Sequence, residues 1–88
     1  MKISEDYIIR QIAGEYIVVP TGKAAVKLNG LINLNETGAF LWKLLQEGAS
    51  KEELLSGLLS EYDADEETAK ADLEEFLDRL SAEGILEV

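Results

Sequence analysis

The chain of 88 residues carries a net charge of −10 and contains neither cysteine nor histidine. Disulfide scaffolds and the usual zinc sites are therefore excluded, as is catalysis by a histidine base or a cysteine nucleophile. Residues 36–88 hold fifteen acidic and four basic side chains, an imbalance that repels phosphate backbones and disfavours a nucleic-acid partner.

The first third of the chain has the composition of β-strands. Residues 7–13 and 15–20 are rich in β-branched and aromatic side chains, and the small pair Ala13-Gly14 between them favours a hairpin. Both faces of these strands are largely apolar, so we expect each face to be covered. Residues 21–30 favour a loop, although the turn signal Asn29-Gly30 also allows a loose pairing. A short third strand is expected at 31–34.

After residue 34 the apolar residues recur at helical spacing. The first helix is predicted from the N-cap Asn35 to Gly48, and the second opens with a capping box formed by Ser50 and Glu53. The third begins near residue 63 or 65 and ends near residue 82, followed by an apolar tail. We therefore predict an α+β fold with three strands, then three helices packed on the sheet as one layer.

Two residues in the predicted helices stand out. Trp42 lies at the edge of the apolar stripe of the first helix, so we expect it to pack in the core with one edge exposed; a contact with a partner is the alternative. Gly57 lies inside the second helix, where glycine costs about 1 kcal/mol relative to alanine. Close packing against a neighbouring element is the expected reason for this glycine, and a ligand contact is the alternative.

The acidic residues around the start of the third helix partly match a calcium-binding pattern. Asp63, Asp65, Glu67 and Glu74 occupy ligand positions of an EF-hand register, but Thr68 stands where that loop requires glycine. An acidic helix start, stabilised by the helix dipole, is the better interpretation. We therefore expect no metal and no cofactor.

The length predicts a single domain over residues 1–88. No uncharged stretch approaches the roughly 20 residues that cross a bilayer, and the N-terminal residues show no signal-peptide pattern. We therefore expect a cytoplasmic protein without a membrane partner.

Four segments in order resemble the PqqD-like family, also called RiPP recognition elements. Residues 30–42 are similar to the family's passage into its first helix, and residues 44–55 to the segment that joins its first two helices. Residues 61–63 resemble the end of its second helix, and residues 72–86 its closing helix and tail. The likeness covers nearly the whole chain, and the ordered set is more specific than any one segment.

The resemblance implies a winged-helix-like fold and an adaptor that is not an enzyme. It implies that the leader segment of a ribosomally made precursor peptide adds as a strand to the third strand and lies against the third helix. The domain thereby presents the precursor to a modifying enzyme, often a radical-SAM protein. An uncovered sheet edge that is short, apolar and free of proline suits this mode. We expect a monomer or a weak homodimer.

The peptide-binding residues expected from this mode lie on two elements. The third strand supplies its whole length, and the third helix supplies one flank of the stripe centred on Leu73: the set is Leu31, Ile32, Asn33, Leu34, Asp72, Phe76 and Arg79. The opposite flank, with Lys70, Glu74, Leu77 and Ser81, is the alternative groove wall. The acidic balance also predicts a lysine or arginine in the peptide, besides apolar anchors.

The sequence leaves two other functions as alternatives. A small structural subunit of a larger enzyme is compatible with every feature of the sequence. A DNA-binding winged helix is disfavoured because acidic side chains crowd the exposed face of the third helix, where they would meet phosphates of the same sign.

Overall fold

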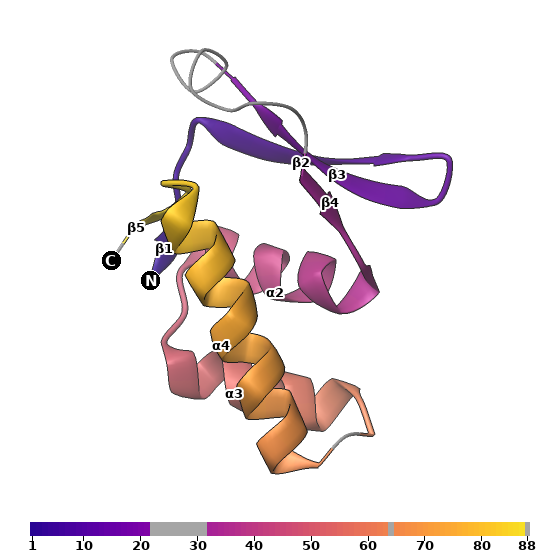
Figure 1. Ribbon diagram of the computed structural model, residues 1–88, viewed down its shortest axis with the longest axis vertical. Coiled ribbons are helices and arrows are strands. Elements are labelled where there is room, and N and C mark those ends of the chain that lie inside the picture. The colour runs from indigo at the N-terminus through magenta and orange to yellow at the C-terminus, as the bar shows by residue number, and fades with distance from the viewer. Residues whose placement is uncertain (22–31, 64, 88) are drawn as a thin grey trace.

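The computed structural model of the protein describes residues 1–21, 32–63 and 65–87. Their elements (Figure 1) are β1 Lys2–Ile3, β2 Tyr7–Ile12, β3 Glu15–Pro20, β4 Ile32–Leu34, α2 Glu36–Glu47, α3 Lys51–Glu61, α4 Glu66–Ala82 and β5 Leu86–Glu87. The predicted α+β arrangement of a three-stranded sheet followed by three helices is confirmed. The expected loop at 21–30, the Asn29-Gly30 turn and Leu31 lie outside the described residues, apart from Thr21.

The β2–β3 hairpin turns at the predicted pair. Ala13 and Gly14 have φ angles of 53° and 81°, and positive φ at both positions defines the type I′ turn that suits the twist of paired strands. The strands pair in antiparallel register from Ile12 opposite Glu15 to Tyr7 opposite Pro20. Residues far apart in β2 and β3 are thereby locked into one register.

The sheet has the order β2-β3-β4, and β4 pairs antiparallel with β3. Its inner face contributes Tyr7, Val18 and Ile32 to the core, each at most 6% exposed. The expectation that both faces are covered is wrong for the far end of the hairpin, where Ile12 is 55% exposed. The reason is visible in Figure 1: the turn end of the hairpin projects beyond the helices.

The helices begin where local capping signals place them. The Asn35 side chain accepts a hydrogen bond of 2.8 Å from the Gly38 N–H, and Ser50 and Glu53 form both bonds of the capping box. The hydrogen bond from the Ser50 N–H lowers the pKa of the Glu53 carboxyl. The third helix, α4, starts after Asp65, which decides between the two starts left open by the sequence.

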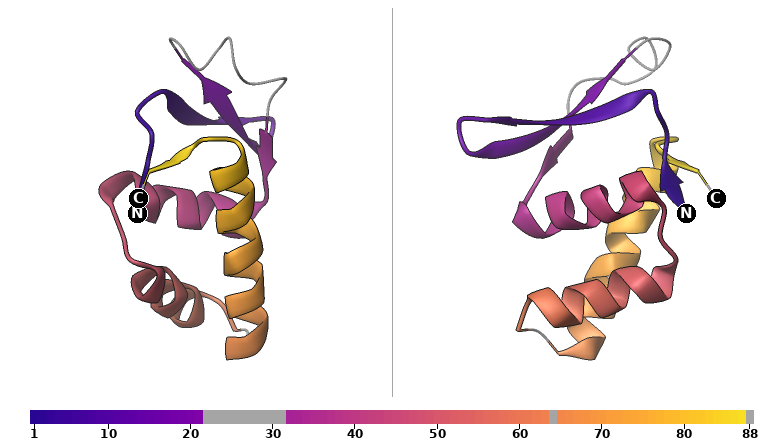
Figure 2. Two further views of the ribbon diagram at one scale, coloured as in Figure 1. Left: turned by 60° about the vertical axis from the view of Figure 1, so that its left-hand side comes forward. Right: turned by 180° about the vertical axis from the view of Figure 1, so that it is seen from behind.

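The three helices lie on one side of the sheet (Figure 2) and enclose the core with it. Trp42 is fully buried, so the expectation of an exposed edge is wrong. Its indole Nε1–H has no hydrogen-bond partner among the described residues. The α2 helix that carries Trp42 also packs against β1, and Ile3 of β1 joins the same core cluster. This additional cover was not expected from the sequence.

A second, two-stranded sheet joins the two ends of the described chain. Ile3 of β1 pairs with Leu86 of β5, and the Ser4 N–H donates to the Ile85 carbonyl at 2.8 Å. The sequence showed only an apolar tail in this region, because a pairing between strands of two residues each leaves no periodic pattern. The described helices include none that is long and apolar enough to cross a bilayer.

Gly57 of α3 packs closely against side chains of α2. A Cβ at this position would lie 3.2 Å from the Leu44 Cδ1 and 3.5 Å from the Phe40 ring. The inference of close packing is therefore confirmed. The absence of a side chain lets the two helices approach and offsets the poor helix propensity of glycine.

This contact predicts that Gly57→Val destabilises the fold by about 1–3 kcal/mol, the usual cost of overpacking, although valine is the better helix former. The exposed neighbour gives the matched control: Ser56→Val should stay within about 0.5 kcal/mol of the parent. Urea unfolding of both variants measures the difference. Equal stabilities would show that the contact between α2 and α3 accommodates a side chain at position 57.

Candidate peptide-binding site

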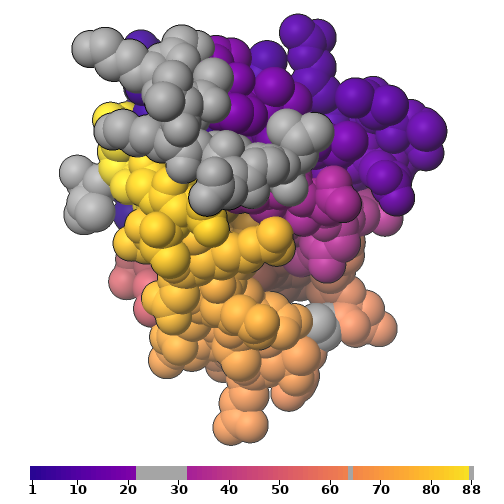
Figure 3. Space-filling model, turned by 45° about the horizontal axis from the view of Figure 1, so that its top comes forward, coloured from indigo at the N-terminus to yellow at the C-terminus, as the bar shows by residue number. Residues whose placement is uncertain are grey.

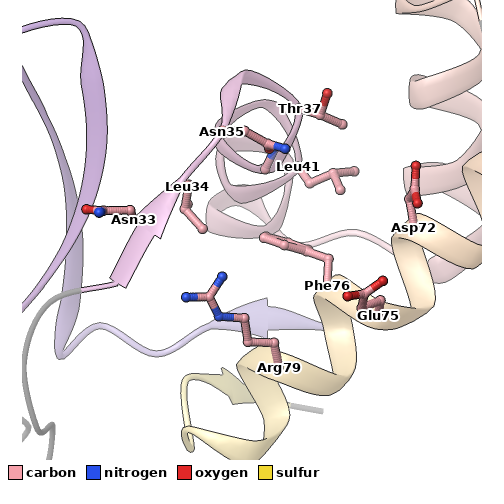
Figure 4. A pocket seen from close by; sticks show the side chains of 10 residues that line it. Asn33, Leu34, Asn35, Thr37, Leu41, Asp72, Glu75, Phe76 and Arg79 are labelled. Carbon is pink, nitrogen blue, oxygen red and sulfur yellow. The ribbon is translucent and has the colours of Figure 1, made fainter.

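A groove of about 450 Å³ runs between β4, the start of α2 and α4 (Figure 4). Figure 3 shows the face on which the hairpin, the start of α2 and the length of α4 lie exposed together. The groove is lined by Asn33, Leu34, Asn35, Thr37, Gly38, Leu41, Asp72, Glu75, Phe76 and Arg79. Strand edge and helix face are therefore walls of one cavity.

The hairpin determines which backbone groups of β3 face β2. In a two-residue hairpin the residues flanking the turn, Ile12 and Glu15, form the first bonded pair, and bonded pairs then alternate along the strands. The Thr21 N–H donates to the Asp6 carbonyl at 2.7 Å, which continues this alternate series beyond β3. The odd-numbered residues of β3 therefore direct their backbone groups toward β2.

The even-numbered residues of β3 consequently direct their backbone groups toward β4. Tyr16 lies opposite Leu34, and Val18 lies opposite Ile32, so these are the bonded pairs of the β3–β4 ladder. Asn33 lies between them, and its N–H and carbonyl point away from β3. In the described part of the chain nothing pairs with that edge of β4, so Asn33 presents one donor and one acceptor at the free edge.

The side chains of β4 alternate between the core and the solvent. Ile32 and Leu34 are buried, at 6% and 7% exposure, whereas Asn33 is exposed. Leu34 reaches the groove, but Ile32 does not line it. Of the strand residues expected from the sequence, the structure therefore brings Asn33 and Leu34 to the groove and places Ile32 in the core.

The floor of the groove is apolar where α4 approaches the start of α2. Phe76 is half-buried there beside Leu34 and Leu41. A Cβ on Gly38 would lie 3.4 Å from the Phe76 Cε1 and 3.2 Å from the Asn35 Oδ1. Because Gly38 has no side chain, the phenyl ring can pack close to the cap of α2.

The flank of α4 with Asp72, Phe76 and Arg79 faces this groove. Glu74, on the alternative flank, instead forms an ion pair of 3.0 Å with Lys51 of α3. The hydrogen bond from Lys51, followed by its charge, lowers the pKa of the Glu74 carboxyl. The two flanks therefore meet different surroundings, and only the first borders β4.

The groove also contains residues that the sequence did not single out for binding. The sequence indicates Asn35 as a helix cap, and the predicted binding set does not include Thr37, Gly38, Leu41 or Glu75. Their proximity to β4 and α4 depends on how α2 packs, which no local pattern reveals. Within the described ranges, no group of three potential metal ligands occurs.

Residues 15–86 match the family model described as Coenzyme PQQ synthesis protein D (PqqD). The chain belongs to the PqqD family. This match confirms the resemblance to the PqqD-like family that the sequence analysis found. None of the curated proteins matches its sequence.

Two solved structures share the fold of this PqqD-family chain. TbiB1 in complex with the TbiA(beta) leader peptide has a TM-score of 0.78 and 30% identity, covering 99% of this chain and 95% of that one. Lasso peptide synthetase B1 complexed with the leader peptide has a TM-score of 0.74 and 20% identity, covering 96% and 93%. The second likeness shows the fold alone.

The cap at Asn35 joins β4 to α2, so its loss should be measurable. Asn35→Ala removes the acceptor of the Gly38 N–H and should lower the free energy of unfolding by about 1 kcal/mol. Asn35→Asp retains a side-chain acceptor and should stay close to the parent. Thermal and urea unfolding of both variants test this, and equal losses in the two would contradict a capping role.

Proposed function

We propose that this chain binds the leader segment of a ribosomally made precursor peptide by strand addition along β4. The carrying observation is that the free backbone edge at Asn33 opens onto a groove whose floor includes Leu34 and Phe76. An edge strand supplies hydrogen bonds to an added strand, while the adjoining groove receives alternate side chains of that strand. The TbiB1 complex supports the proposal, because TbiB1 shares this fold and 30% sequence identity and is bound to a leader peptide.

In this proposal the groove contributes more to the free energy of peptide binding than the backbone hydrogen bonds do. Within the described residues the edge offers the Asn33 N–H and carbonyl and the Asn35 N–H, since the Asn35 carbonyl accepts from Ala39. Three such bonds at about 1 kcal/mol each fall far short of the roughly 8 kcal/mol of a micromolar complex. Apolar contacts with Phe76 and Leu34 supply much of the remainder in this proposal.

In this proposal the domain, residues 1–88, acts as an adaptor in the cytoplasm and catalyses nothing itself. It presents the precursor to a separate modifying enzyme, for which we propose a radical-SAM protein, and it acts as a monomer or weak homodimer. A structural subunit that does not touch the substrate is the alternative. The two differ in whether the isolated chain binds a leader, which calorimetry with the leader of an adjacently encoded precursor decides.

Proline substitutions in β4 test the strand addition. Asn33→Pro removes an N–H that points outward, so the domain should remain folded and lose leader binding. Ile32→Pro removes an N–H bonded to β3 and a core side chain, so it should cost about 3 kcal/mol or more of stability. Circular dichroism and leader titration are measured on both.

Asn33→Ala is the matched control, because it removes the same side chain but keeps the N–H. It should bind the leader at nearly the parent affinity. If Asn33→Pro stays folded and binds as tightly as Asn33→Ala, strand addition at this edge is refuted.

The groove wall on α4 is tested by two alanine variants. Arg79→Ala removes a side chain that lines the groove and should weaken leader binding, whereas Glu74→Ala removes a side chain paired with α3 and should not. Both positions are solvent-exposed, so both variants should fold. Normal binding by Arg79→Ala together with weak binding by Glu74→Ala would place the peptide on the other flank.

A further inference from the structure

The groove wall formed by α4 has an ordered charge pattern. Asp72 and Glu75 come first along the helix and Arg79 last, and all three line the groove. The helix rise of about 1.5 Å per residue spreads them over roughly 10 Å. Glu75 and Arg79 have the spacing of a helical ion pair, yet the one ion pair among the described residues is Lys51–Glu74. The three groove charges are therefore unpaired within the described structure.

The acidic and basic side chains of the groove lie beside different ends of β4. Figure 1 shows β4 and α4 running in roughly opposite directions. In Figure 4 Arg79 extends toward Leu34 and the first part of β4, whereas Asp72 lies toward the start of α2, on the side of Thr37. The acidic end of the groove thus adjoins the end of β4, and the basic end adjoins its beginning.

We propose that the groove selects an extended peptide segment with the order cation, any residue, apolar residue, any residue, acid. This inference rests on the proposed function and specifies its ligand. Side chains two residues apart share one face of a strand, so the three named positions all point into the groove. The apolar residue meets Phe76, the cation meets Asp72 and Glu75, and the acid meets Arg79.

The direction follows from strand pairing. An antiparallel added strand is the more stable arrangement, and its first residues lie beside the end of β4, where the acidic side chains are. The cation therefore precedes the acid in the peptide. Four strand residues span about 13 Å against roughly 10 Å on the helix, a difference that long flexible side chains accommodate.

Charge order rather than net charge is the selective feature. The acidic half of the chain attracts any cationic peptide, but a peptide and its charge-swapped isomer have the same net charge and the same apolar residue. Exposed ion pairs contribute little individually, yet the swap replaces two attractions by two repulsions. We expect the isomer to bind about tenfold more weakly at low salt.

The experiment is a selection from random linear dodecapeptides displayed against the full chain, followed by titration of synthetic peptides. The probes are the most enriched peptide and its isomer with the cation and the acid exchanged. The enriched sequences should share the proposed order, and the isomer should show the tenfold loss. The double variant Asp72→Lys/Arg79→Glu keeps the net charge and should prefer the isomer.

The matched control is Lys70→Glu/Asp78→Lys, which exchanges charges at two exposed positions of α4 that do not line the groove. It should keep the preference of the parent.

Circular dichroism verifies that each variant folds. If a variant does not fold, the comparison of the two peptides on the parent chain still decides the question. If no peptide is enriched, the proposed function fails together with this inference. If peptides are enriched but the parent binds both isomers equally, or prefers the reverse order, peptide binding stands and charge-order selection is overturned.

Discussion

The type I′ turn at Ala13 and Gly14 sets the hydrogen-bond phase on which the site depends. Once the turn makes Ile12 and Glu15 a bonded pair, every second residue of β3 faces β2 and the others face β4. The same alternation then leaves the backbone of Asn33 facing outward. A turn at the far end of the hairpin thus decides which groups of the edge strand can accept a partner.

The second requirement is a helix placed close enough to the edge to form a groove. The cap at Asn35 starts α2 directly after β4, and the missing side chain of Gly38 lets Phe76 of α4 pack against that start. The first turn of α2 therefore holds the edge strand β4 and the helix α4 close together. Because the described edge of β4 is only three residues long, the proposed binding mode assigns most of the discrimination between peptides to the groove.

Local signals in the sequence were sufficient for most elements of the fold. The pair Ala13-Gly14, the cap Asn35 and the capping box at Ser50 each act within a few residues, so their structural effect can be inferred without knowledge of packing. The spacing of apolar residues likewise identified the helices, whereas the flank of α4 that carries Phe76 was chosen on the family resemblance. The ordered set of these patterns was enough to indicate the family.

Other features depended on contacts between distant parts of the chain. The outward position of Asn33 and the inward position of Ile32 follow from the register with β3, and a register is a property of two strands rather than one. The β1–β5 pairing and the complete burial of Trp42 arise in the same way, since residues far apart in the sequence supply the cover. The sequence by itself determined the hairpin, the three helices and the start of the first two helices. Only the tertiary structure decided which faces and edges remain open and brought Glu75 into the groove, because burial and pairing are set by neighbours that no local pattern specifies.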